Sequence, residues 1–170
     1  SSVALAVDLG LNYFDEEQDL SASLSVQNIG TQVKAYDDGM KTHLPFTLTL
    51  GFSKGFDHLP VRIHAAFTDV TRWKSNYYAL PDADSKKVKF GSKLLNHFVV
   101  GLDILPTNYL YIAAGYNFRR AYELKASGSS KMAGLSFGAG IDLKGFKFGL
   151  SYARYHLAAS SIMGSLAYSF

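Results

Sequence analysis

Hydrophobic and polar residues alternate along most of the chain, in runs of roughly ten positions. The first run sets Val3, Leu5 and Val7 against small or polar residues, and a late run does the same with Phe148 and Leu150. Such alternation gives a β-strand one apolar face and one polar face. About nine runs predict an all-β fold. They lie near residues 3–12, 20–27, 46–53, 61–68, 97–104, 110–117, 133–142, 146–152 and 162–170.

The connections between these runs alternate in length. Short ones cover residues 15–19, 57–60, 105–108 and 144–145, and long ones cover residues 31–45, 74–94 and 121–130. Long strands with short turns at one end and long loops at the other are typical of outer-membrane barrels, whereas sandwich strands have about 5–6 residues. The sequence therefore predicts a transmembrane antiparallel up-and-down β-barrel. A water-soluble β-sandwich that binds a partner remains the alternative.

Composition supports strands and excludes several other classes. Charged residues make up 18% of the chain, aromatic residues 14%, and no apolar stretch reaches the ~18 residues of a membrane-spanning helix. The mean hydropathy of +0.02 does not oppose a barrel, because alternation dilutes the apolar residues. There is no cysteine, so disulfides and thiolate metal sites are excluded. A net charge of +3 suits anionic lipid or lipopolysaccharide and does not require nucleic acid.

The last run ends on aromatic residues, with Tyr168 and Phe170 on one face. This resembles the C-terminal signal that outer-membrane assembly machinery recognises. If Phe170 is periplasmic, every short turn is periplasmic and every long loop is extracellular. About nine strands is an odd number, whereas single-chain bacterial barrels have an even one, and bare sheet edges in lipid are costly. We therefore expect residues 1–170 to be one partial barrel domain whose N-terminal strands are missing, which also fits the absence of a signal peptide at Ser1.

Five segments, in this order, carry a family resemblance. They are Ser25 to Gly30, Leu44 to Phe46, Gly115 to Arg120, Gly134 to Gly140 and Tyr155 to Ala158. With them the chain resembles the PorV/PorQ family of outer-membrane proteins of the type IX secretion system, which is related in architecture to FadL-type transporters. The resemblance runs over nearly the whole chain, and the segment Tyr155 to Ala158 looks more like PorQ than PorV.

The resemblance implies a fold and a function. The family is similar to a barrel of roughly 14 strands, of which this chain would be the C-terminal nine or so. It implies a non-enzymatic component of the attachment complex, without cofactors, that anchors a PorZ-like surface partner through the long loops 31–45 and 74–94. The alternatives are a PorV-like shuttle that carries cargo to a PorU-like sortase, or a FadL-like transporter of hydrophobic small molecules.

The residues show no catalytic or metal-binding motif. The stretch from Gly134 to Gly138 matches Gly-x-Ser-x-Gly, but it lies inside a strand run and not at a strand-to-helix turn. Small inward residues that relieve crowding in a barrel explain it better.

Three groups of residues are the candidate sites. Ionisable residues on the inward face form a lumen polar cluster, which serves either structural pairing or ligand binding: Asp8, Arg62, His64, His97, Asp103 and Asp142. Basic residues at the outer rim suit lipopolysaccharide phosphates or an acidic partner: Arg72, Lys74, Arg119, Arg120, Lys131 and Arg154. Outward aromatic residues near strand ends suit membrane interfaces: Tyr13, Phe46, Tyr116, Phe118, Phe146, Tyr168 and Phe170.

Overall fold

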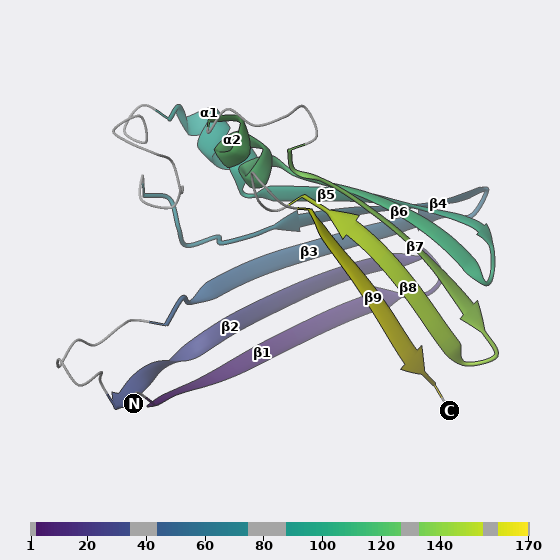
Figure 1. Ribbon diagram of the computed structural model, residues 1–170, viewed down its shortest axis with the longest axis horizontal. Coiled ribbons are helices and arrows are strands. Elements are labelled where there is room, and N and C mark those ends of the chain that lie inside the picture. Colours follow the sequence, from purple (N-terminus) through teal and green to yellow (C-terminus); the bar gives the residue numbers. More distant parts are fainter. Residues whose placement is uncertain (1–2, 35–43, 75–87, 127–132, 155–159, 170) are drawn as a thin grey trace.

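Nine antiparallel strands form a single sheet in sequence order (Figure 1). The computed structural model describes residues 3–34, 44–74, 88–126, 133–154 and 160–169. The strands are β1 (Val3–Asp15), β2 (Leu20–Lys34), β3 (Thr47–Phe56), β4 (Leu59–Phe67), β5 (Phe98–Thr107), β6 (Leu110–Asn117), β7 (Leu135–Leu143), β8 (Phe146–Ala153) and β9 (Ser161–Tyr168). The predicted all-β class and up-and-down order are confirmed.

The register of the strands keeps apolar residues on one side of the sheet. A row of directly opposed residues runs across β4 to β9 on what we call the apolar face: Ile63, Leu102, Ala114, Phe137, Tyr152 and Ile162. The neighbouring row, on the polar face, consists of smaller or polar residues: Ser21, Ser53, His64, Gly101, Gly115, Ser136, Ala153 and Ser161. The alternation read from the sequence is therefore the alternation of the sheet.

The apolar face is exposed along its length. The exposed fraction of the residue is 38% at Leu102, 62% at Leu150 and 72% at Ile162. In the part of the chain that the structure describes, one sheet is present and no second sheet covers this face. An uncovered apolar surface of this extent is unusual for a soluble monomer and marks a surface that meets lipid or protein.

Connections of different length lie at opposite ends of the sheet. The four short ones join β1 to β2, β3 to β4, β5 to β6 and β7 to β8, and the four long ones all lie at the other end, which we call the long-connection end. Two short helices lie there, α1 (Phe90–Asn96) and α2 (Phe118–Ala126) (Figure 1). None of the described helices is long and apolar enough to cross a membrane.

Some boundaries at this end differ from the predicted ones. No helix was predicted here, although α1 lies across the end of the expected loop 74–94 and α2 begins before the expected loop 121–130. The second strand was also predicted to end too early, because β2 continues to Lys34. An irregularity explains the last error: the register shifts where Val7 and Leu9 pair with β2, and Asn28 there has φ 59°. Asparagine tolerates this left-handed conformation better than most residues.

One turn is fully explained by its residues. Lys144 and Gly145, which join β7 to β8, both have positive φ, 50° and 89°. A two-residue turn with positive φ at both positions matches the twist of the flanking strands, and glycine adopts it without strain. This turn fixes the register that opposes Phe146 to Leu143.

The sheet has two open edges among the described residues. β1 pairs only with β2, and β9 pairs only with β8. Both edge strands are exposed along nearly all their length. Closure into a barrel, and a number of strands beyond nine, therefore stay predictions.

Candidate functional site

The polar face is hollowed along the sheet. One hollow of about 390 Å³ extends over β2 to β6, and its lining combines serines, glycines and His64 with apolar residues such as Ala66 and Val99. A second hollow of about 250 Å³ extends over β6 to β9, and a third of about 290 Å³ extends over β5 to β9. The hollows exist because most side chains on this face are small and extend only a short distance from the backbone.

His64 and Asp103 form a close polar pair on this face. His64 Nε2 lies 2.7 Å from Asp103 Oδ2, and the two side chains are 39% and 26% exposed. They come from neighbouring strands, where Asp103 opposes Arg62 and His64 opposes Gly101. Since a carboxylate only accepts, Nε2 of the imidazole donates this hydrogen bond.

Arg62 is directed to a different partner. Its Nη2 donates to both carboxylate oxygens of Asp19, at 2.9 and 3.0 Å, although Asp103 stands opposite it in the register. Asp19 belongs to the turn between β1 and β2, so the pair joins that turn to β4 across β3. Such a pair, about one third exposed at each partner, contributes roughly 0.2–1 kcal/mol.

The other residues of the lumen polar cluster lie apart from these pairs. Asp8 accepts the backbone N–H of Asn28 at 2.7 Å. Asp142 Oδ2 lies 3.4 Å from Lys147 Nζ across the β7–β8 pair. His97 precedes β5 and forms the C-cap of α1 rather than part of a strand. The structure therefore brings together His64 and Asp103, but it does not bring the six residues into one site.

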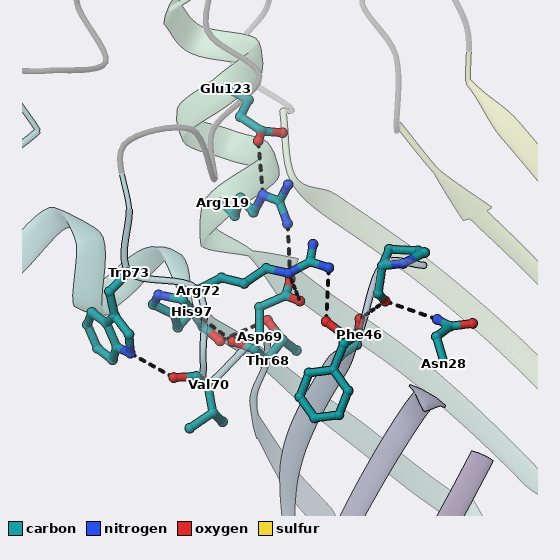
Figure 2. A network of polar contacts seen from close by, with 12 residues as sticks. Asn28, Phe46, Thr68, Asp69, Val70, Arg72, Trp73, His97, Arg119 and Glu123 are labelled. Carbon is teal, nitrogen blue, oxygen red and sulfur yellow. Dashed lines mark hydrogen bonds and ion pairs between the residues drawn. The ribbon is translucent and has the colours of Figure 1, made fainter. Parts of the chain in front are cut away.

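The long-connection end holds a denser network, which we call the rim network (Figure 2). Arg119 Nε donates to Glu123 Oε1 at 2.9 Å, and its Nη1 donates to Asp69 Oδ2 at 3.2 Å. The carboxylate of Glu123 also lies 3.5 Å from Arg120, and that of Asp69 lies 3.7 Å from Arg72. Two buried carboxylates are thus each shared between two guanidinium groups.

The rim network joins segments that are distant in sequence. Arg72 Nη2 donates to the carbonyl of Phe46 at 2.9 Å, and Asn28 Nδ2 donates to that of Pro45 at 3.1 Å (Figure 2). Through Asp69 and Arg119 the network therefore connects β2, the start of β3, the segment after β4 and the helix α2. It fixes the ends of these elements relative to one another.

A second set of contacts holds the segment after β4 to the C-terminal end of α1. The backbone N–H of Thr68 donates to the carbonyl of His97 at 2.7 Å, and His97 Nδ1 lies 2.7 Å from the carbonyl of Thr68. The carbonyl only accepts, so Nδ1 carries the proton. The Trp73 indole donates to the carbonyl of Val70 at 2.7 Å, and its ring centroid lies 4.5 Å from that of the fully buried His97.

The remaining predicted residues fall in different environments. Lys74 is exposed and Arg154 is half-buried beyond β8, while Lys131 and Phe170 lie outside the described residues. Tyr168 contacts Phe146, with ring centroids 4.6 Å apart, at the short-turn end of the apolar face. Tyr116 contacts Phe118 at the other end, with centroids 4.9 Å apart.

Sequence reasoning missed the acidic members of these arrangements, Asp19, Asp69 and Glu123. Only one signal was available: Arg119 and Glu123 are spaced i, i+4, which brings side chains together on a helix. No sequence pattern indicates that Asp69 approaches Arg119, because the contact depends on how the segments that follow β4 and β6 meet at the long-connection end, on either side of β5.

The described residues were also compared with two kinds of chemical site, a metal centre and a serine nucleophile. Among them no group of three His, Cys, Asp or Glu side chains is placed to hold a metal ion. Ser136, the serine of the Gly-x-Ser-x-Gly stretch, lies within β7 and opposes Gly115 and Ala153 on the polar face. No family model, no curated protein and no solved structure matches this chain.

Proposed function

We propose that this chain forms part of the wall of a transmembrane β-barrel of the outer-membrane type. The observation that carries the proposal is the exposed apolar face, which continues across the sheet from β1 to β9. In water this surface would be strongly unfavourable at about 25 cal/mol per Å², whereas in lipid it needs no cover.

Dimensions support the same environment. The strands have 8 to 15 residues, and strands of about 9–11 residues tilted near 45° cross the hydrocarbon layer. Aromatic contacts occur near both ends of the apolar face, as interfacial belts require: Phe67 with Phe98 at one end and Phe146 with Tyr168 at the other. In this proposal the polar face, with His64 and Asp103, lines the lumen.

The open edges of the sheet need partners in such an environment. Unpaired backbone groups in lipid cost several kcal/mol each, so the proposal requires further strands to pair with β1 and β9 and close the wall. The short turns would then be periplasmic and the long-connection end extracellular.

We further propose a structural, non-enzymatic role for the long-connection end, which is to hold a surface protein. The resemblance to the PorV/PorQ family suggests the type IX attachment complex and a PorZ-like partner. The rim network supports such a role, because it makes this end a rigid platform of basic and acidic groups. Detergent extraction from the native membrane tests it. A co-purified surface protein is expected, whereas recovery of bound lipid alone would favour a transporter.

The membrane proposal is tested by neighbouring residues that point to opposite faces of β8. Leu150 lies on the apolar face and Ser151 on the polar face, and both are exposed. Leu150→Arg should cost about 2–4 kcal/mol in the membrane, whereas Ser151→Arg should be tolerated in a polar lumen. The measurement is the fraction of each variant that stays in the membrane after alkaline extraction. Equal retention of both variants would contradict the proposal.

A further inference from the structure

The helix α1 has its polar and apolar sides reversed relative to a helix packed on a soluble core. Phe90, Leu94 and Leu95 are exposed, at 71%, 38% and 52%. Asn96, by contrast, is only 4% exposed, and Ser92 is half-buried. At 100° per residue the three apolar side chains fall within one arc of about 140°, and Ser92 and Asn96 fall on the opposite side.

This exposed arc continues the apolar face of the sheet through a chain of aromatic rings. Phe67 and Phe98 oppose each other at the ends of β4 and β5, with centroids 5.0 Å apart. Trp73 lies 6.1 Å from Phe67 and stacks on Phe90 at 5.9 Å and 15°. The apolar surface therefore does not stop where the strands end but extends onto α1.

Basic residues flank the exposed arc. Lys89 precedes the helix and is exposed, and Lys93 lies one turn later, half-buried and about 60° outside the arc on the side of Phe90. The first turn of α1 contains no acidic residue. An apolar arc with lysines at its edge is complementary to the boundary between acyl chains and lipid phosphates, where lysine stems lie along apolar groups and the ammonium reaches the phosphate.

We propose that α1 is an interfacial anchor that binds the lipid leaflet at the long-connection end of the sheet. Phe90, Leu94 and Leu95 enter the layer between acyl chains and headgroups, and Lys89 and Lys93 bind anionic phosphate groups of the same lipids. This inference rests on the proposed membrane location of the sheet and adds a lipid-binding element to it.

The single tryptophan of the chain, Trp73, is the natural reporter because it stacks on Phe90. The protein is reconstituted into phosphatidylcholine–phosphatidylglycerol vesicles whose acyl chains are brominated either near the headgroup or near the bilayer centre. We expect headgroup-proximal bromine to quench Trp73 about twofold more strongly than central bromine, because interfacial helices lie ~5–10 Å into the boundary.

Variants of α1 test whether this helix causes the quenching of Trp73. Phe90→Ser combined with Leu95→Ser should remove most of the quenching, and Lys89→Gln combined with Lys93→Gln should weaken its dependence on phosphatidylglycerol. Ser92→Ala, on the protein-facing side of α1, is the matched control and should leave the quenching unchanged. Quenching that is the same in the Phe90/Leu95 variant would overturn the proposal.

A second reporter separates this proposal from the membrane location itself. In a Trp73→Phe background, Leu102→Trp places the indole on the apolar face of the sheet. If central bromine quenches this tryptophan while Trp73 is quenched by neither lipid, the sheet is in the membrane and the anchor proposal is wrong. If neither tryptophan is quenched, both proposals fail. If neither brominated lipid quenches Trp73 and only a co-purified surface protein shields it from solvent, the anchor proposal is also wrong and α1 binds a protein partner.

Discussion

Arg119 is the residue whose removal tests the rim network most sharply. It joins Asp69 and Glu123, whose side chains are only 12% and 6% exposed, through hydrogen bonds of 3.2 and 2.9 Å. Arg119→Met keeps most of the aliphatic stem and removes the charge. The substitution leaves two largely buried carboxylates with weaker cationic partners.

The expected cost follows from these partners. Removing one member of a buried ion pair costs about 3–5 kcal/mol, because the other charge stays buried without compensation. Here Arg72 and Arg120 remain 3.7 and 3.5 Å from the two carboxylates and offset part of this. We therefore expect Arg119→Met to lower the free energy of unfolding by about 2–3 kcal/mol.

Arg120 provides the matched control. It contacts the same Glu123, but at 3.5 Å and with its own side chain 46% exposed. Arg120→Met should cost only about 0.2–1 kcal/mol, as exposed ion pairs do. Urea unfolding in detergent measures both variants: Trp73 emission reports the long-connection end, and far-ultraviolet circular dichroism reports the whole sheet.

The network also predicts a coupling. Asp69→Asn combined with Arg119→Met should cost less than the sum of the single substitutions, because each removes the same contact. Two results would show that Arg119 does not bridge the carboxylates as described. One is that Arg119→Met is no more destabilising than Arg120→Met. The other is that the costs of Asp69→Asn and Arg119→Met add fully in the double variant.

Two further predictions concern the backbone of the sheet. The ring of Tyr111 lies over Gly140, where an added Cβ would clash with it, so Gly140→Val should lower the free energy of unfolding in urea by about 1–3 kcal/mol. Gly164→Val is the control, because a Cβ at Gly164 would meet no atom within 4 Å. An equal cost for the two variants would contradict the packing argument. Asn28 has φ 59° and donates to Pro45, so Asn28→Val should cost about 1–2 kcal/mol more than Asn28→Gly, which loses only the hydrogen bond. Equal thermal midpoints for the two Asn28 variants would contradict this account.

Alternation predicted nine strands and their two faces, and the connection lengths predicted their up-and-down order, although β2 extends beyond its predicted end and His97 lies outside the strands. Residues such as Leu102 and Gly101 take opposite faces because the side-chain period of a strand is two, and this period is visible in the sequence. The short turn at Lys144 and Gly145 was equally readable, because glycine and a short connection leave few backbone choices.

The long-connection end was less predictable. The helix α1 has only 7 residues, which is less than two turns, so a period of 3.6 residues does not stand out in the sequence, and no helix was predicted there. The partners of Arg62 and Arg119 were missed for another reason. Asp19 and Asp69 are 43 and 50 positions away in sequence, and only the folded sheet brings them close.

In the proposed barrel the apolar face of the sheet meets lipid and the polar face meets water. Because the chain has no cysteine, single cysteines placed along β8 can carry a spin label without background. Labels at Phe148 and Leu150 lie on the apolar face, and labels at Lys147 and Ser151 lie on the polar face. In reconstituted vesicles the accessibility of the labels should alternate: oxygen, which concentrates in lipid, should reach positions 148 and 150, and a water-soluble nickel chelate should reach positions 147 and 151. Equal access of the nickel chelate to all four positions would contradict it.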